Sequence, residues 1–147
     1  MIQIARGWTD SHLHEFEVGG VRYGIPDPDS PSDEEVASEK RAGLGKCLGS
    51  LRSFRYAYDF GDDWLHKIKV EKSLPPDGLP FPGCTGGANA RPPEDVDGAF
   101  GYEQFLEALA DPSHPEHQVM LDWYGDRSDA AELDLAQINR LPGAIRV

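Results

Sequence analysis

Residues 54–71 constrain the fold of this chain more than any other segment, because their side chains alternate in character. Aromatic, imidazole or aliphatic side chains occupy every second position on both sides of a short polar turn: Phe54, Tyr56, Tyr58, Trp64, His66, Ile68 and Val70. A period of two is typical of strands, whose successive side chains point to opposite faces of a sheet. Gly61 lies in the connection, and glycine readily adopts a left-handed backbone conformation. The segment therefore predicts a β-hairpin with Gly61 in the left-handed position.

A second hairpin is predicted at residues 12–25. Its first strand alternates from residue 12 to residue 18, which places His12 and His14 on the same face as Phe16. Gly19 and Gly20 form a favourable two-residue turn, because both positions tolerate a positive φ. Residues 26–40 hold several prolines and many charges, so a solvated loop is expected there.

Helices are predicted in the second half of the chain. Four apolar residues at positions i, i+3, i+4 and i+7 form an amphipathic stripe: Tyr102, Phe105, Leu106 and Leu109. Ser113 and Glu116 match a capping box, which predicts a following helix that buries Val119, Met120 and Trp123. A last helix is predicted to carry Leu135 and Ile138 and to end at Leu141 or Pro142. Residues 73–98 are rich in proline and glycine and fit no regular element, so they are a candidate wall of a site.

The order of these elements, strands first and helices afterwards, predicts an α+β fold. We expect a mainly antiparallel sheet of two hairpins, with the C-terminal helices packed on one face. The length of 147 residues suits a single domain, and the 39% of hydrophobic residues suffice for a core.

The charge balance is strongly acidic, with a formal net charge of −12 at pH 7. An acidic chain repels phosphate backbones, so binding to nucleic acid is not expected. The closest approach to a basic cluster surrounds the main hairpin, and a solvated strand face explains it better: Arg52, Arg55, Lys67, Lys69 and Lys72. Two cysteines indicate a reducing compartment, and the sequence shows neither a signal peptide nor a membrane-spanning run. We therefore expect a cytoplasmic protein without a membrane partner.

Three histidines and two aspartates are the first candidates for a polar site. If the two hairpins join one sheet, His12, His14 and His66 could converge near the turn that carries Asp59 and Asp62. Imidazole and carboxylate ligands suit zinc and other first-row metals, so these histidines are candidate metal ligands. The alternative is that each histidine is a core residue bonded to backbone or carboxylate, and the aspartates are ordinary turn residues.

Three residues of the later loop complete the candidate polar site. Cys84 is either a reactive thiol or a half-buried structural cysteine. Glu94 and Asp95 follow two prolines, and they either cap the helix at residues 99–110 or join the site. Nucleophile and phosphate-loop motifs are absent from the sequence. No cofactor is expected, although a divalent metal is possible.

Six short motifs, in order along the chain, resemble the plasmid pRiA4b ORF-3-like family, which includes the passenger "TnpR" protein of an insertion element. They lie at residues 7–16, 56–66, 84–95, 101–106, 111–117 and 133–135. The resemblance implies a small α+β protein that is associated with mobile elements, and it implies no established biochemical activity.

Two departures from the family pattern affect the expectations. Family members begin with a further strand and most of a helix before the Gly7-Trp8-Thr9 segment, so this chain is read as N-terminally truncated. A missing strand would expose a sheet edge, which favours a homodimer or another protein partner. Arg91 and Val96 stand where many members carry cysteines, which argues against a cysteine-based metal site.

The leading hypothesis is a small acidic binding or accessory module without catalytic activity. The alternative is a metal-dependent or acid–base enzyme that uses the histidines and aspartates named above. A weaker alternative is association with nucleic acid through the lysine face of the hairpin.

Overall fold

The structure is a computed structural model that describes residues 2–27, 29, 35–74, 83–125 and 133–140. The chain divides into two compact units. We call His12–Pro75 the sheet unit, and Met1–Ser11 together with Pro76–Val147 the helical unit. The elements confirm an α+β fold. A single domain stays a prediction.

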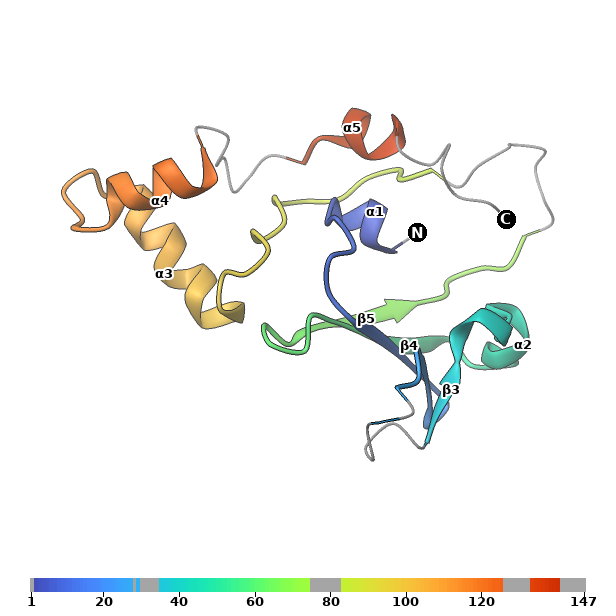
Figure 1. Ribbon diagram of the computed structural model, residues 1–147. Helices are drawn as coiled ribbons and strands as arrows, with labels where there is room; N and C mark the ends of the chain where they lie inside the picture. Colours follow the sequence, from blue (N-terminus) through green and yellow to red (C-terminus); the bar gives the residue numbers. More distant parts are fainter. Residues whose placement is uncertain (1, 28, 30–34, 75–82, 126–132, 141–147) are drawn as a thin grey trace. The chain divides into compact units, whose positions relative to one another are not determined.

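The sheet unit holds a five-stranded sheet in the order β3-β2-β1-β4-β5. Its strands are β1 (His14–Val18), β2 (Val21–Gly24), β3 (Val36–Ser38), β4 (Ser53–Tyr58) and β5 (Trp64–Lys69). The two predicted hairpins, β1–β2 and β4–β5, are both present, and β1 also pairs antiparallel with β4 (Figure 1). The sheet is mixed rather than purely antiparallel, because β3 pairs parallel with β2.

Strand β3 falls in a segment where only a solvated loop was expected. It has three residues, too few to display a period of two, and its pairing partner is β2. A 3₁₀ turn η2 (Glu39–Arg41) and helix α2 (Leu44–Leu48) follow it and lead to β4.

The core of the sheet unit lies on one face of the three central strands. Tyr56 and Tyr58 are each 1% exposed, and Phe54 is buried beside them. The ring of Tyr56 lies 4.9 Å from that of Phe16, and 5.7 Å from each of the imidazoles of His14 and His66. Aromatic pairs of this kind contribute roughly 0.5–1.5 kcal/mol each beyond the area that they bury. The aromatic face of the main hairpin is therefore the packed face of the sheet.

The turn of the main hairpin differs from the prediction. The left-handed residues are Asp59, with φ 55°, and Asp63, with φ 54°, rather than Gly61. Oδ1 of Asp59 accepts hydrogen bonds from the backbone N–H groups of Gly61 and Asp62, at 3.0 and 3.4 Å. Aspartate tolerates this conformation because its short side chain bonds the local backbone.

The helical unit contains α1 (Ile2–Arg6), α3 (Gly98–Ala110), α4 (His117–Tyr124) and α5 (Leu135–Arg140). Phe105 of α3 is buried, and its ring packs edge-on against Trp123 and Tyr124 of α4 at 5.9 and 5.3 Å. The amphipathic stripe of α3 is thus used against α4.

The expected capping box of α4 is not formed. Ser113 donates its hydroxyl hydrogen to Asp111 Oδ1 at 2.7 Å, and α4 begins after Glu116. The predicted burial of the α4 side chains is also wrong, because Val119 is 62% exposed and Trp123 is 50% exposed. Among the described residues, no helix combines the length and the apolar character that crossing a bilayer requires.

Candidate functional site

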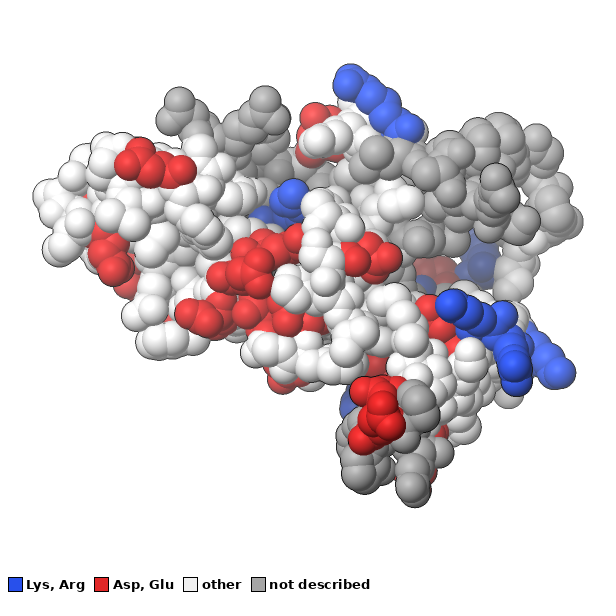
Figure 2. All heavy atoms as spheres, in the orientation of Figure 1, with Lys and Arg blue, Asp and Glu red and all other residues white. Residues whose placement is uncertain are grey.

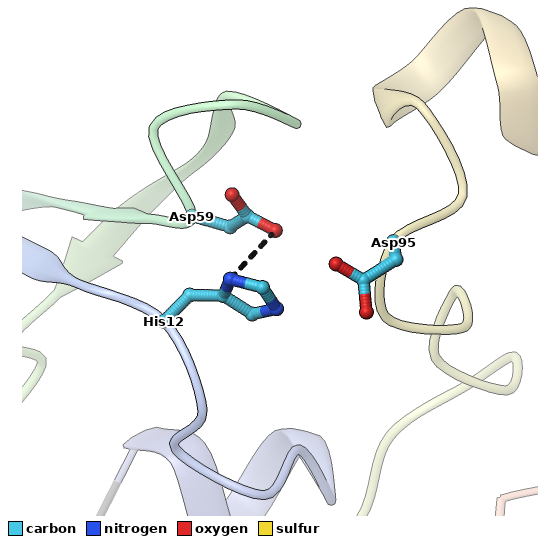
Figure 3. Close-up of side chains that lie close together, drawn as sticks. All are labelled: His12, Asp59 and Asp95. Atoms are coloured by element: carbon cyan, nitrogen blue, oxygen red, sulfur yellow. Dashed lines mark ion pairs between the residues drawn. The ribbon is translucent and has the colours of Figure 1, made fainter.

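Asp59 is the most constrained polar residue of the sheet unit. It is 7% exposed, and its backbone N–H donates to the carbonyl of Leu13 at 2.9 Å. Nδ1 of His12 lies 3.6 Å from Oδ2 of Asp59, the ion pair that Figure 3 marks with a dashed line. Asp95 is also labelled there, and it belongs to the helical unit, where its backbone is left-handed with φ 60°.

His12 lies outside the strand on which it was expected, because β1 begins at His14. Its ring packs edge-on against Tyr58 at 5.9 Å. A carboxylate close to an imidazole is a common feature of acid–base and metal-binding histidines, and Asp59 supplies such a carboxylate at 3.6 Å from His12.

His14 and His66 take different partners. Nε2 of His14 donates to Glu39 Oε2 at 3.0 Å, and Nδ1 of His66 donates to the carbonyl of Tyr56 at 3.3 Å. The two imidazoles share the packed face of the sheet, with the ring of Tyr56 between them. The expected convergence of His12, His14 and His66 on one point is not found among the described residues.

The remaining candidates have structural partners. Asp62 Oδ2 accepts a hydrogen bond from Trp64 Nε1 at 3.2 Å. In the helical unit, the two carboxylate oxygens of Glu94 accept from the backbone N–H and the hydroxyl of Thr9, at 3.0 and 2.6 Å. These bonds tie two of the sequence motifs together, and Trp8 Nε1 adds a bond to the carbonyl of Pro92 at 3.1 Å.

Cys84 is a free cysteine of intermediate burial. The side-chain amide of Asn139 bonds both backbone groups of Cys84: the N–H of Cys84 donates to Oδ1 at 2.7 Å, and Nδ2 donates to the carbonyl of Cys84 at 2.8 Å. The thiol Sγ lies 3.6 Å from the carbonyl oxygen of Gly86. These contacts favour a structural role for the segment around Cys84.

An exposed sheet edge was expected from the sequence, but it was not assigned to a strand; β5 lies at one edge of the sheet. Among the described residues, β5 pairs with β4 alone, and β5 is twice as long as β3 at the opposite edge. The N–H of Val70 donates to the carbonyl of Arg52 at 2.9 Å, which fixes the even-numbered residues as those bonded to β4. In an antiparallel ladder the intervening residues direct their N–H and C=O groups away from the partner. Leu65, Lys67 and Lys69 therefore present backbone donors and acceptors at the edge.

The outer face of the sheet carries a charge pattern that ends at this edge. One cross-strand row contains Arg22, Glu17, Arg55 and Lys67, on β2, β1, β4 and β5 in turn. Arg55 Nη1 lies 3.3 Å from Glu17 Oε2, whereas Lys67 follows Arg55 with the same sign of charge. Lys67 and Lys69 form no ion pair with another described residue. The alternation of charge thus stops at β5.

Leu65 stands beside these lysines and is 67% exposed. An open hollow of about 470 Å³ lies on this face, and it is lined by Glu15, Glu17, Arg55, Ala57, Leu65, His66 and Lys67. Figure 2 shows Lys and Arg side chains gathered over the part of the view where Figure 1 labels α2. The signal in the sequence was the pair of alternate lysines next to an exposed leucine, which a solvated face also explains.

Fold and site together define a small α+β protein whose mixed sheet ends in the basic strand β5, which pairs with no second strand of the described part of the chain. The chain matches the plasmid pRiA4b ORF-3-like protein family over residues 1–137, and it belongs to that family.

Two relatives extend this assignment. The uncharacterized protein y4hQ of Sinorhizobium fredii is 41% identical over 146 residues, which cover 95% of this chain and 73% of that protein. The crystal structure of MM3350 from Methanosarcina mazei Go1, a protein of unknown function, is similar with a TM-score of 0.80 and 36% sequence identity. That match covers 92% of this chain and 77% of the other. The biochemical function of the family is not established.

Proposed function

We propose that this protein is a non-catalytic binding module whose β5 edge accepts an extended segment of a protein partner as an additional strand. The observation that carries the proposal is the edge of β5, where Leu65, Lys67 and Lys69 direct backbone hydrogen-bonding groups away from β4 and no other strand in the described ranges pairs with them. Strand addition of this kind draws affinity from main-chain hydrogen bonds and specificity from alternate side chains.

The charge of the edge favours another protein over a second copy of this chain. An antiparallel pair of β5 strands would bring the lysines of both copies together, and like charges directly across from each other are destabilising. Lysine on an edge strand is also a common protection against unwanted pairing. A second copy of this chain is therefore disfavoured as the strand that pairs with β5.

Nucleic acid is disfavoured as a ligand of the same edge. The formal net charge of the chain is −12, and Glu17 lies in the same cross-strand row as Arg55 and Lys67. Phosphate backbones need several cations without neighbouring carboxylates to hold them. Family membership supports the further proposal that the partner is encoded by, or acts on, a mobile element, and the two free cysteines support action in the cytoplasm.

A peptide-binding experiment with edge variants tests the proposed function. A fluorescent seven-residue peptide with alternating threonines is titrated into the full chain, and binding is followed by anisotropy. Lys67→Pro removes the outward N–H and leaves the bonds to β4 intact, because proline is tolerated at the solvent side of an edge strand. Lys67→Ala is the matched control, since it keeps that N–H.

We expect the wild type and Lys67→Ala to bind the peptide, and we expect Lys67→Pro to lose at least about tenfold in affinity. Circular dichroism shows whether the proline variant keeps its fold. Equal binding by a folded Lys67→Pro variant, no binding by the wild type, or preferred binding of duplex DNA at ~200 mM salt would overturn the proposal.

The His12–Asp59 pair favours a second candidate function, acid–base or metal-dependent chemistry at His12. Its support is the burial of Asp59 and the 3.6 Å separation between Nδ1 and Oδ2. The test is thermal unfolding with and without Zn²⁺ or Mn²⁺, for the wild type and for His12→Ala. A metal-induced increase in Tm that His12→Ala abolishes supports this candidate, and the same Tm in all conditions contradicts it.

A further inference from the structure

We infer that the partner strand carries acidic side chains at two alternate positions and an apolar side chain at the next, in the pattern acidic-x-acidic-x-apolar. This inference rests on the proposed function and specifies the chemistry of the segment that β5 would accept. It is argued from the register of the sheet and the charges at its edge.

The pattern follows from the side chains that share the edge with the outward backbone groups. Lys67 and Lys69 point to the outer face two residues apart, and Leu65 precedes them on the same face. A strand added antiparallel to β5 would place its own alternate residues opposite Lys69, Lys67 and Leu65 in that order. Opposite charges across a strand pair stabilise it, and an exposed leucine gains from an apolar neighbour.

An acidic strand paired with a basic neighbour already occurs in the sheet, on the other side of β4. Strand β1 carries Glu15 and Glu17 at alternate positions, and it lies antiparallel beside β4. Glu17 pairs with Arg55 across the strands, and Glu15 pairs with Arg22 of β2, with Oε2 2.6 Å from Nη2. Strand β1 thus supplies carboxylates on one side of the β4–β5 hairpin. An acidic strand beside β5 would supply carboxylates on the other side.

The inferred strand also offsets an unfavourable juxtaposition of two like charges. Arg55 and Lys67 are directly opposite each other, and like charges at this spacing destabilise a strand pair. A carboxylate on the far side of Lys67 would give this lysine a cross-strand neighbour of opposite charge, as Glu17 does for Arg55 and Arg22 in the same row. The free protein bears this repulsion, so the gain on binding an acidic strand exceeds that of binding a neutral one.

Two peptides that differ only in charge test the inference. The first has the sequence Thr-Glu-Thr-Glu-Thr-Val-Thr, and the second has glutamine in place of both glutamates. Two favourable cross-strand pairs predict about fivefold tighter binding of the acidic peptide at low salt. We expect this preference to vanish in ~1 M NaCl, where charges are screened within a few ångströms.

A charge-reversal variant supplies the matched control. The double substitution Lys67→Glu and Lys69→Glu keeps every backbone group of the edge, and it should prefer a peptide with lysines in place of the glutamates. Lys46→Glu, in α2, should leave the preference unchanged.

The outcomes separate the inference from the function on which it rests. Equal affinity for the glutamate and glutamine peptides, both abolished by Lys67→Pro, would overturn the acidic pattern and leave strand addition standing. Failure of every peptide to bind would overturn both and would leave the lysines as a protection of the edge. A dimer in light scattering that Lys67→Pro converts to a monomer would overturn the choice of partner.

Discussion

Glu94 binds Thr9 through both of its carboxylate oxygens, and 85 positions of sequence separate the two residues. This contact joins the segment after α1 to the segment before α3 within the helical unit. It brings the Gly7-Trp8-Thr9 and Pro92-Pro93-Glu94 motifs into direct contact.

Glu94→Ala should therefore destabilise the helical unit. Hydrogen bonds to a charged group contribute about 1.5–3 kcal/mol each, and both bonds of Glu94 are exposed to solvent, which weakens them. We therefore expect the variant to lose roughly 2–4 kcal/mol in the free energy of unfolding, less than the full sum for two bonds. Urea denaturation followed by tryptophan fluorescence measures the loss. Glu107→Ala, at an exposed site on α3, is the control, and an equal effect of both variants would contradict the structural role of Glu94.

Gly101→Ala should be strongly destabilising, although alanine normally favours a helix. A Cβ at Gly101 would overlap the carbonyl oxygen of Val96. Relieving this overlap requires movement of the backbone, and we expect a loss of at least about 2 kcal/mol in the free energy of unfolding. Gly45→Ala in α2 has open space around it and should be neutral or stabilise by up to about 1 kcal/mol. Similar thermal stability of the two variants would be inconsistent with the close approach at Gly101.

Asp59→Asn should leave the stability of the protein nearly unchanged, whereas Asp59→Ala should lower it. Its φ of 55° is a conformation that asparagine adopts readily, and an asparagine Oδ1 can still accept the bonds from Gly61 and Asp62. Asp59→Ala loses both bonds and keeps an unfavourable backbone angle, so we expect a loss of about 2–4 kcal/mol. Differential scanning calorimetry compares the variants. A Tm for Asp59→Ala equal to that of Asp59→Asn would show that the turn does not depend on this side chain.

Asp111 should contribute to stability at neutral pH and lose that contribution in acid. The hydroxyl of Ser113, and then its backbone N–H, lower the pKa of the Asp111 carboxyl below its usual value. A depressed pKa stabilises the folded state above the unfolded pKa, near 3.9, and the effect disappears as the pH falls through the folded value.

Ser113→Ala tests this dependence. It removes the larger cause of the shift, so an NMR titration should show the pKa of Asp111 rising toward its usual value. Ser38→Ala, in the sheet unit, is the control and should leave the titration of Asp111 unchanged. An unchanged midpoint in Ser113→Ala would contradict the assigned cause.

The hairpins could be predicted because alternation is a local property of the sequence. The packed face with Tyr56 and His66 followed directly from the period of two. Strand β3 could not be predicted, since three residues carry no readable period and β2 specifies its position. The turn was assigned to Gly61 because glycine is the residue most permissive of a positive φ, yet Asp59 meets the same need by bonding its own backbone.

The site was less predictable than the fold, because the partners of each histidine come from distant segments. Nothing in the sequence indicates that His14 bonds Glu39, or that His12 precedes the strand and turns to Asp59. The capping box at Ser113 failed for a related reason, since Asp111 competes for the same hydroxyl. The spacing of residues along the sequence does not show which of several possible hydrogen-bond partners a side chain takes.

Every second residue of β5 directs its backbone groups away from β4 and its side chain to the outer face of the sheet, so a strand bound as proposed would be recognised at alternate positions only. Substitutions at the intervening positions of a bound segment would leave its affinity unchanged. A shift of the pairing register by one residue would turn the matching side chains to the opposite face of the sheet. Segments of unrelated sequence would therefore compete for this edge if their charged residues had the same spacing. The residues at their other positions would not need to be similar.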